Sequence, residues 1–344
     1  MNVAMIGDKR EISKGTGIER YTEELLNGLG KKVEIEFMGT STSSQFTEIT
    51  NHTIISPLKI LWLKNDFDLF HAVAPVNALS FPLLGKPTVI TYHDLTSMLY
   101  KKGSKFHVRL TVPFFYRVGK YCNKVIANST QTKEELVKYL NFPDEKIEVV
   151  NLGVDEKFKP IKRDEKDYFV IGYLGSLIER KRIDYLIKSF YYLKFSKINV
   201  KLNIYGNKSQ NYSKLYRLVK ELKIDKNVEF KGSVTDDSLV DVYNSFDIFV
   251  LPSDSEGFGL PILEAQRCGV PVIIRDNANI PREVTKCCVR AKSEKDMANK
   301  IYELLINPEL RRNIISIGEK YSRLFTWEKT VGKTLKIYEK ILEI

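Results

Sequence analysis

Cysteine and histidine are scarce in this chain, which has four of each among 344 residues. Cys287 and Cys288 are adjacent, and the cysteines lack the paired spacing of zinc ligands. Neither a disulfide framework nor a zinc site is therefore expected. We interpret all four cysteines as structural thiols.

Long apolar runs are also missing. The hydrophobic content of 43% is ordinary for a globular chain, but the longest apolar runs are too short and too interrupted to span a bilayer. The opening MNVAMIG predicts a buried first strand, with no basic leader of the kind that starts a signal peptide. We therefore expect a cytoplasmic protein.

The chain has fewer acidic than basic residues, 43 against 54, which gives a net charge of +11. Nucleic acid is one partner of basic proteins. However, no helix-turn-helix, RNA-recognition or zinc-finger pattern accompanies the charge. Nucleic-acid binding is thus the less favoured alternative, and no nucleic-acid partner is expected.

A basic arc is predicted on a helix within residues 101–124. At about 100° per residue, four cations share one side: Arg109, Arg117, Lys120 and Lys124. Five apolar residues lie opposite: Leu110, Phe114, Val118, Tyr121 and Cys122. Pro113 marks a kink or a late helix start. An ordinary amphipathic helix packed on the core explains the pattern, and peripheral contact with an anionic membrane is the functional alternative.

Apolar, β-rich runs alternate with helix-like segments along the whole chain. This alternation predicts an α/β protein with doubly wound parallel sheets, and the length suits two domains. We predict an N-terminal domain at residues 1–158, a C-terminal domain at 159–325 and a closing helix at 326–344. Ligands are expected at the carboxyl ends of both sheets, in a cleft between the domains.

The segment at residues 255–269 reads SEGFGLPILEAQRCG. Its glycines allow the backbone to approach a phosphate closely, and a helix starting near Leu260 and stopping at Gly269 would aim free N–H groups at the same anion. Glu256 and Glu264 are then placed to accept hydrogen bonds from hydroxyls, those of a sugar and a ribose respectively. The plainer alternative is a strand, a turn and a helix with two solvated glutamates.

Several blocks of sequence carry a resemblance to one family. They are TYHDLT, ANSTQTKEEL, EKIEVVNLGVDEKFKP, YFVIGYLGSLIERKRIDYLIKSF, LNIYGNKS, SDSEGFGLPILEA and FTWEKT, in this order. The chain resembles glycosyltransferase family 4, also called group 1, which has the GT-B fold of two Rossmann-like domains facing a central cleft. YLGSLIERK followed by SDSEGFGLPILEA is similar to the branch that contains many mannosyltransferases using GDP-mannose.

The resemblance implies an acceptor-side N-terminal domain, a nucleotide-sugar donor domain and a last helix that crosses back to the first domain. It assigns catalytic roles to His93, Arg180, Lys181 and Glu256. It places Asp94 on the acceptor side. The implied donor-binding residues are Gly15, Gly17, Ser176, Gly206, Gly257, Phe258, Gly259, Leu260 and Glu264.

Three positions depart from the family pattern. Ser176 stands where an arginine often follows the glycine, and Arg180 is the candidate substitute. Thr16 separates Gly15 from Gly17, where the family usually has a glycine pair. Arg282 intervenes between a proline and the glutamate that usually follows it directly. The loop around Gly15 does not complete a GxGxxG motif, so a dehydrogenase is not expected.

The predicted reaction transfers a hexose, mannose or glucose, from a GDP- or UDP-linked donor to a hydroxyl of a glycan or lipid-linked acceptor. Retention of configuration is implied by the family, and no carboxylate declares itself as a nucleophile. Asp66 and Asp68 form an Asp-x-Asp, yet no metal and no cofactor are expected. A sugar-nucleotide epimerase or a phosphorylase on the same scaffold is the alternative enzyme.

Overall fold

The chain divides into two compact units. The first unit contains residues 1–153 together with residues 326–344, and the second contains residues 154–325. The computed structural model describes residues 1–8, 17–40, 54–99, 106–163, 166–194, 196 and 198–343, with backbone alone at 8, 40 and 106–111. Residues 154–158, which the sequence analysis assigned to the first domain, lie in the second unit.

The first unit contains a six-stranded parallel sheet in the order β2-β1-β3-β4-β5-β6. Its strands are β1 (Asn2–Asp8), β2 (Glu34–Thr40), β3 (Leu69–Ala72), β4 (Thr88–Tyr92), β5 (Lys124–Ala127) and β6 (Ile147–Val149). Strands β3 and β4 are buried along their whole length, as expected where helices cover both faces of a sheet.

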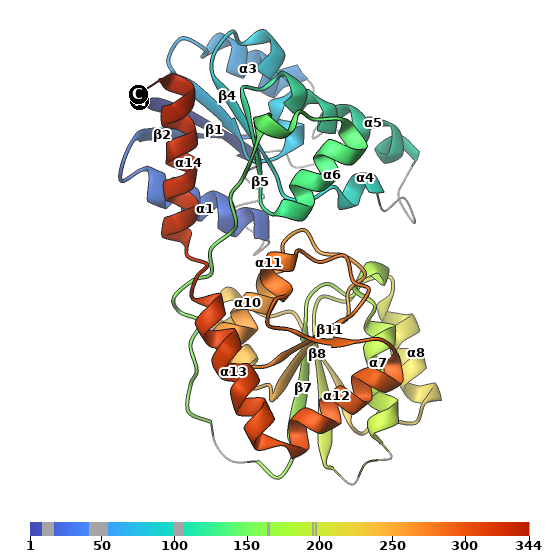
Figure 1. Cartoon of the computed structure of the whole chain (residues 1–344). Coiled ribbons are helices and arrows are strands. Elements are labelled where there is room, and N and C mark those ends of the chain that lie inside the picture. The colour runs from blue at the N-terminus through green and yellow to red at the C-terminus, as the bar shows by residue number, and fades with distance from the viewer. Residues whose placement is uncertain are drawn as a thin grey trace. The chain divides into compact units, whose positions relative to one another are not determined.

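Helices of the first unit are α1 (Gly17–Leu29), α3 (Ser56–Trp62), α4 (Thr96–Leu99), α5 (Phe106–Arg117), α6 (Thr130–Leu140) and α14 (Trp327–Leu342). Helix α14 packs against α1 and crosses it, as Figure 1 shows. Short 3-10 turns supplement them: η3 (Pro75–Ala78), η4 (Phe81–Leu83), η5 (Val118–Tyr121) and η6 (Asp144–Lys146).

The second unit repeats the plan, with strand order β12-β11-β10-β7-β8-β9 and all pairs parallel. Its strands are β7 (Phe169–Leu174), β8 (Val200–Tyr205), β9 (Val228–Gly232), β10 (Ile248–Leu251), β11 (Val272–Arg275) and β12 (Val289–Ala291). The predicted fold class, an α/β chain with two doubly wound parallel sheets, is confirmed.

Helices α10 (Leu260–Arg267) and α13 (Pro308–Ser322) lie on one face of this sheet, and α7 (Ile183–Leu193) and α12 (Glu294–Ile306) on the other (Figure 1). The remaining elements are α8 (Tyr212–Glu221), α9 (Leu239–Asn244), α11 (Arg282–Thr285), η7 (Glu179–Lys181) and η8 (Asp236–Ser238). Among the described residues, no helix is both long enough and apolar enough to cross a membrane.

The predicted basic arc at residues 101–124 is wrong in two respects. Lys124 begins strand β5, because α5 gives way to the 3-10 turn η5 and the helix does not continue to it. Phe114 and Tyr121, predicted on the buried side, are 58% and 71% exposed. Of the apolar set, Val118 and Cys122 are buried as predicted, and the side chain of Leu110 lies outside the described residues.

Candidate donor-binding site

The topological switch point of the second sheet lies between β7 and β10. From β7 the chain proceeds through β8 to β9 on one side, and from β10 through β11 to β12 on the other. In doubly wound sheets, ligands bind at such a point, outside the carboxyl ends of the strands. The loops after β7 and β10 carry most of the residues predicted to bind the donor.

The loop after β10 leads into helix α10 through the predicted Gly-Phe-Gly turn. Gly259 is the N-cap with φ 96°, a conformation that favours glycine, so Leu260 is the first helical residue and Pro261 the second. Phe258 is buried. The helix ends as predicted, with Gly269 at φ 70°. Its N–H donates to the Gln266 carbonyl, and the next N–H to the Ala265 carbonyl, which completes a Schellman motif.

Glu256 and the basic pair after β7 are brought together by this arrangement. The Lys181 ammonium donates to both carboxylate oxygens of Glu256, at 2.6 and 2.7 Å. One terminal nitrogen of Arg180 lies 3.7 Å from the same carboxylate and donates to the Ser255 carbonyl. All three side chains are less than one-fifth exposed, so their charges act on one another with little screening by water.

Glu264 lies one turn inside α10 and is only 4% exposed. Its Oε2 accepts a hydrogen bond of 2.7 Å from the hydroxyl of Tyr243, on α9. Sequence reasoning missed Tyr243, because nothing in its local pattern distinguishes it from a packing residue. The role of Glu264 towards a ribose remains a prediction.

Gly206 follows β8 and lies against the backbone after β7. A Cβ built at this position would be 2.0 Å from the Gly175 carbonyl oxygen, and the Gly206 N–H donates to the Gly232 carbonyl at 2.7 Å. Only glycine permits this approach of two loops. Ser176, next to Gly175, is exposed and its carbonyl accepts from the buried hydroxyl of Tyr173.

His93 follows β4 in the first unit. Its Nε2 is 3.0 Å from the Val73 carbonyl, which can only accept, so this nitrogen carries the proton. Burial lowers the pKa of His93 to about 4, although the nearby Asp94 acts in the opposite direction. The ring is therefore neutral at physiological pH and its Nδ1 is an acceptor. Asp94 accepts from the Thr96 N–H at 2.8 Å, at the start of α4.

A buried polar network lies behind His93. The ring nitrogens of His71 contact the Tyr338 hydroxyl at 2.5 Å and the Thr91 hydroxyl at 2.8 Å. Thr91 in turn contacts the Tyr21 hydroxyl at 2.8 Å, and the Tyr21 ring meets the His93 ring edge to face. The network thus links α14, β3, β4 and α1 to the predicted sugar-contacting residue. The sequence analysis assigned His71 no role.

The remaining predicted positions add little. Gly15 lies outside the described residues, and Gly17 is the first residue of α1.

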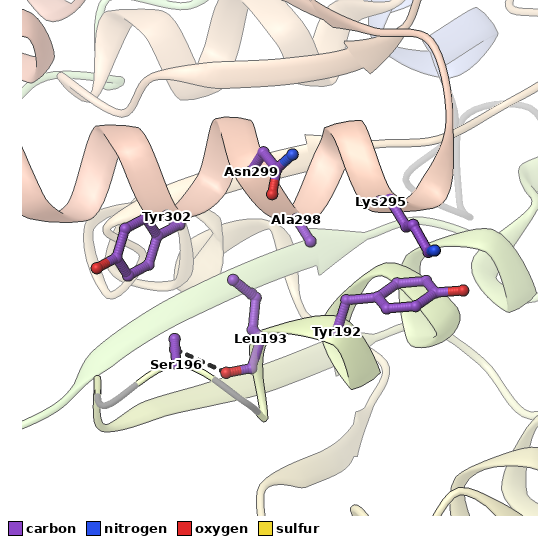
Figure 2. Close-up of a pocket in the computed structure, with 7 residues that line it drawn as sticks. All are labelled: Tyr192, Leu193, Ser196, Lys295, Ala298, Asn299 and Tyr302. Atoms are coloured by element: carbon purple, nitrogen blue, oxygen red, sulfur yellow. Dashed lines mark hydrogen bonds between the residues drawn. The ribbon is translucent and has the colours of Figure 1, made fainter.

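A cavity of about 640 Å³ lies between α7 and α12, lined by Tyr192, Leu193, Ser196, Lys295, Ala298, Asn299 and Tyr302 (Figure 2). It contains none of the predicted site residues. In the part of the chain that the structure describes, no group of three or more histidine, cysteine or acidic side chains could hold a metal ion.

Two family models match the chain in succession. Glycosyltransferase Family 4 matches residues 15–158, and Glycosyl transferases group 1 matches residues 154–321. O-antigen chain mannosyltransferase B of Escherichia coli is 24% identical over 94% of this chain and 96% of its own length. An uncharacterized glycosyltransferase of Methanocaldococcus jannaschii is 29% identical over 77% of this chain and 72% of its own.

Solved structures show the same fold at low identity. Sucrose-phosphate synthase from Thermosynechococcus elongatus has a TM-score of 0.84 at 18% identity, covering 100% of this chain and 99% of that one. Anabaena HepE, in complex with UDP and glucose, has a TM-score of 0.78 at 17% identity, with 98% and 99% covered. These likenesses confirm the predicted GT-B fold. The two family models, which together match residues 15–321, show that the chain belongs to the group 1, or family 4, glycosyltransferases.

Proposed function

We propose that this glycosyltransferase moves a hexose, mannose or glucose, from a nucleotide diphosphosugar to an acceptor hydroxyl with retention, giving an α-linkage. Similarity to an O-antigen chain mannosyltransferase favours mannose, and the resemblance to the branch that uses GDP-mannose favours a GDP donor. The complex of HepE with UDP and glucose favours a UDP-linked donor and glucose. The proposal therefore includes both nucleotides.

One observation carries the proposal: Lys181, Arg180 and Glu256 meet at the switch point of the second sheet. A departing nucleoside diphosphate develops negative charge, and two fixed cations in a poorly hydrated site stabilise that charge more in the transition state than in the ground state. The N-terminus of α10 adds N–H donors for the same phosphates. We assign Lys181 and Arg180 to the leaving group, and Glu256 to hydroxyls of the transferred sugar.

Cations of the protein do here what a metal ion does in other transferases, which is why we propose a metal-independent reaction. Glu256 is held by Lys181 and is therefore a poor candidate for a covalent nucleophile. We propose attack by the acceptor on the same face from which the leaving group departs, with the phosphate assisting removal of the acceptor proton. His93 contributes its neutral Nδ1 as an acceptor for a sugar hydroxyl, and Asp94 contributes to the acceptor side.

A glycan or a lipid-linked sugar is the proposed acceptor, taken at the cytoplasmic face of the membrane. The exposed surface of α5 and η5 supports contact with lipid, because Phe114, Arg117 and Tyr121 lie close together along the chain and all are exposed. An arginine between aromatic side chains suits an anionic headgroup region. The variant Phe114→Ser/Tyr121→Ser should co-sediment less with phosphatidylglycerol vesicles than the control Tyr216→Ser does. Equal co-sedimentation would remove this surface from the proposal.

The donor is identified by thermal stabilisation with GDP, UDP and their mannose and glucose conjugates, in the presence of EDTA. Selective stabilisation names the nucleotide, and NMR of the transfer product then shows whether the anomeric configuration is retained. No stabilisation by any compound would contradict the donor site, and stabilisation only without EDTA would contradict metal independence. Turnover without an acceptor would favour the epimerase or phosphorylase.

Substitution of the site tests the assignments. Lys181→Met should lower kcat by about 10²–10³-fold, as loss of one transition-state contact does in other enzymes, and Glu256→Gln should abolish most transfer without unfolding the protein. Lys220→Met is the control. Lys220 lies on helix α8 and also pairs with a carboxylate, that of Asp225, at 2.8 Å. Full activity of the Glu256 variant would overturn its role.

A further inference from the structure

Asp254 lies two residues before Glu256 and joins three loops of the second unit. Its Oδ1 accepts from Arg182, which follows β7, at 3.2 Å. The same oxygen accepts from Arg275, the last residue of β11. One carboxylate oxygen is thus shared by two guanidinium groups that come from elements on either side of β10.

The backbone of Asp254 makes a second set of connections. Its N–H donates to the Arg180 carbonyl at 2.9 Å, and its carbonyl accepts from the Asn279 N–H at 2.8 Å. The Asn279 carbonyl then accepts from the Glu256 N–H at 3.1 Å. The position of the Glu256 backbone therefore depends on Asn279, which Asp254 also binds, and Asp254 is in turn bound to the backbone of Arg180.

The two arginines are themselves constrained. Arg182 is the N-cap of α7 in the left-handed conformation, φ 49°, which is uncommon for a residue with a side chain, and its Nε lies 3.3 Å from Asp184. Arg275 is 9% exposed and its guanidinium lies 5.0 Å from the centre of the Tyr185 ring. Such strained and buried groups persist only where their surroundings hold them firmly.

Removing the charge of Asp254 would leave two cations near the donor site without their shared partner. Each guanidinium could then compete with Lys181 for Glu256, because a carboxylate attracts any poorly hydrated cation in reach. Only the backbone hydrogen bonds would then hold the loops after β7, β10 and β11 together. The Lys181–Glu256 pair would adopt more than one geometry.

We propose that Asp254 is a positioning residue for sugar transfer: through Arg182 and Arg275 it holds the loops after β7, β10 and β11 so that Arg180, Lys181 and Glu256 meet the donor together. The proposal rests on the proposed function of these three residues. Asp254 itself does not contact the donor in this scheme.

The test compares Asp254→Asn with Asp247→Asn. The two aspartates lie at opposite ends of β10, their side chains are 25% and 27% exposed, and each is near an arginine, which in the case of Asp247 is Arg163 at 3.6 Å. Asp254→Asn should lower kcat/KM for the donor on the order of 10²-fold, the scale of a misplacement of about 1 Å. Asp247→Asn should leave kcat/KM for the donor unchanged, although it should lower the free energy of unfolding by a similar amount.

A double-mutant cycle that combines Asp254→Asn with Arg182→Gln provides a readout that a purely structural role would not affect. If Asp254 and Arg182 act as one unit, the double variant should have a kcat/KM no lower than that of the poorer single variant. Additive losses, or equal effects of Asp254→Asn and Asp247→Asn, would overturn the proposal. Hydrogen exchange of the amides in residues 253–259 and 276–279 should accelerate in Asp254→Asn alone.

The exchange measurement needs no donor, so it separates two kinds of failure. Unchanged exchange in Asp254→Asn overturns the clamp even if the enzyme transfers sugar as proposed. Accelerated exchange in an enzyme that binds no nucleotide sugar contradicts the proposed function instead, and with it the role of Asp254 in transfer.

Discussion

Mild acid should destabilise the first unit far more than the second. Burial lowers the pKa of His71 to about 3, with His93 adding to the effect, and lowers that of His93 to about 4, against a usual value of 6.5. All four histidines of the chain lie in residues 1–153, and the second unit, residues 154–325, has none. The titration of histidine therefore acts on one unit alone.

The sign follows from proton uptake. Between pH 6.5 and the lowered values, the unfolded chain binds protons at these two positions that the folded chain does not, so the free energy of unfolding falls as the pH falls. Each histidine contributes about 2 kcal/mol of this loss between pH 7.5 and pH 5, at 1.36 kcal/mol per unit. His71 and His93 together account for about 4 kcal/mol, a large part of the stability of a typical domain.

Tryptophan fluorescence reports the first unit selectively, because both tryptophans, Trp62 and Trp327, belong to it. Trp327 is 8% exposed and should signal unfolding. Urea unfolding at pH 7.5, 6 and 5 should show the fall, and His71→Gln should reduce the pH dependence by about half, since one of two equal contributions is removed. A fluorescence-detected change below about 1 kcal/mol between pH 7.5 and pH 5 would refute the reasoning.

Three glycine substitutions test further contacts of the same structure. Gly28→Ala should destabilise the first unit by about 1–3 kcal/mol, because the new Cβ would be 2.4 Å from Val331 across the contact of α1 with α14. Gly332→Ala, which meets nothing within 4 Å, should stabilise it by about 0.4–1 kcal/mol, and urea unfolding that ranks the two variants in the opposite order would contradict the packing. Gly206→Ala should abolish thermal stabilisation by nucleoside diphosphates, since its Cβ would press on the Gly175 backbone; unchanged stabilisation would separate these loops from the donor site.

Helix α10 shows how far local signals reach. Glycine and proline act through the backbone of a few consecutive residues, so the predicted start near Leu260 and stop at Gly269 are both confirmed, although Pro261 is the second helical residue and not the first. The alternation of apolar runs predicted both sheets for a similar reason, because each strand must be buried over a short and continuous stretch.

The segment at 101–124 shows where the same reasoning fails. A constant turn of about 100° per residue was assumed, but the chain changes to a 3-10 turn at Val118 and then to a strand at Lys124. A small change in the angle per residue moves side chains such as Tyr121 from the predicted buried face to the surface. Periodicity cannot reveal such a change, because packing of the following strand decides where the helix stops.

The sequence by itself determined the elements, the glycine turn and the residue types available for sugar transfer, since these depend on neighbours along the chain. Only the tertiary structure decided that Lys181 meets Glu256, 75 positions away, and that His71 meets Tyr338, 267 positions away. Strand order is the physical reason for the first pair, because it places β7 beside β10 and not beside β9. The packing of α14 on α1 brings the second pair within reach. Contacts between distant residues depend on how elements pack, and no local pattern encodes that.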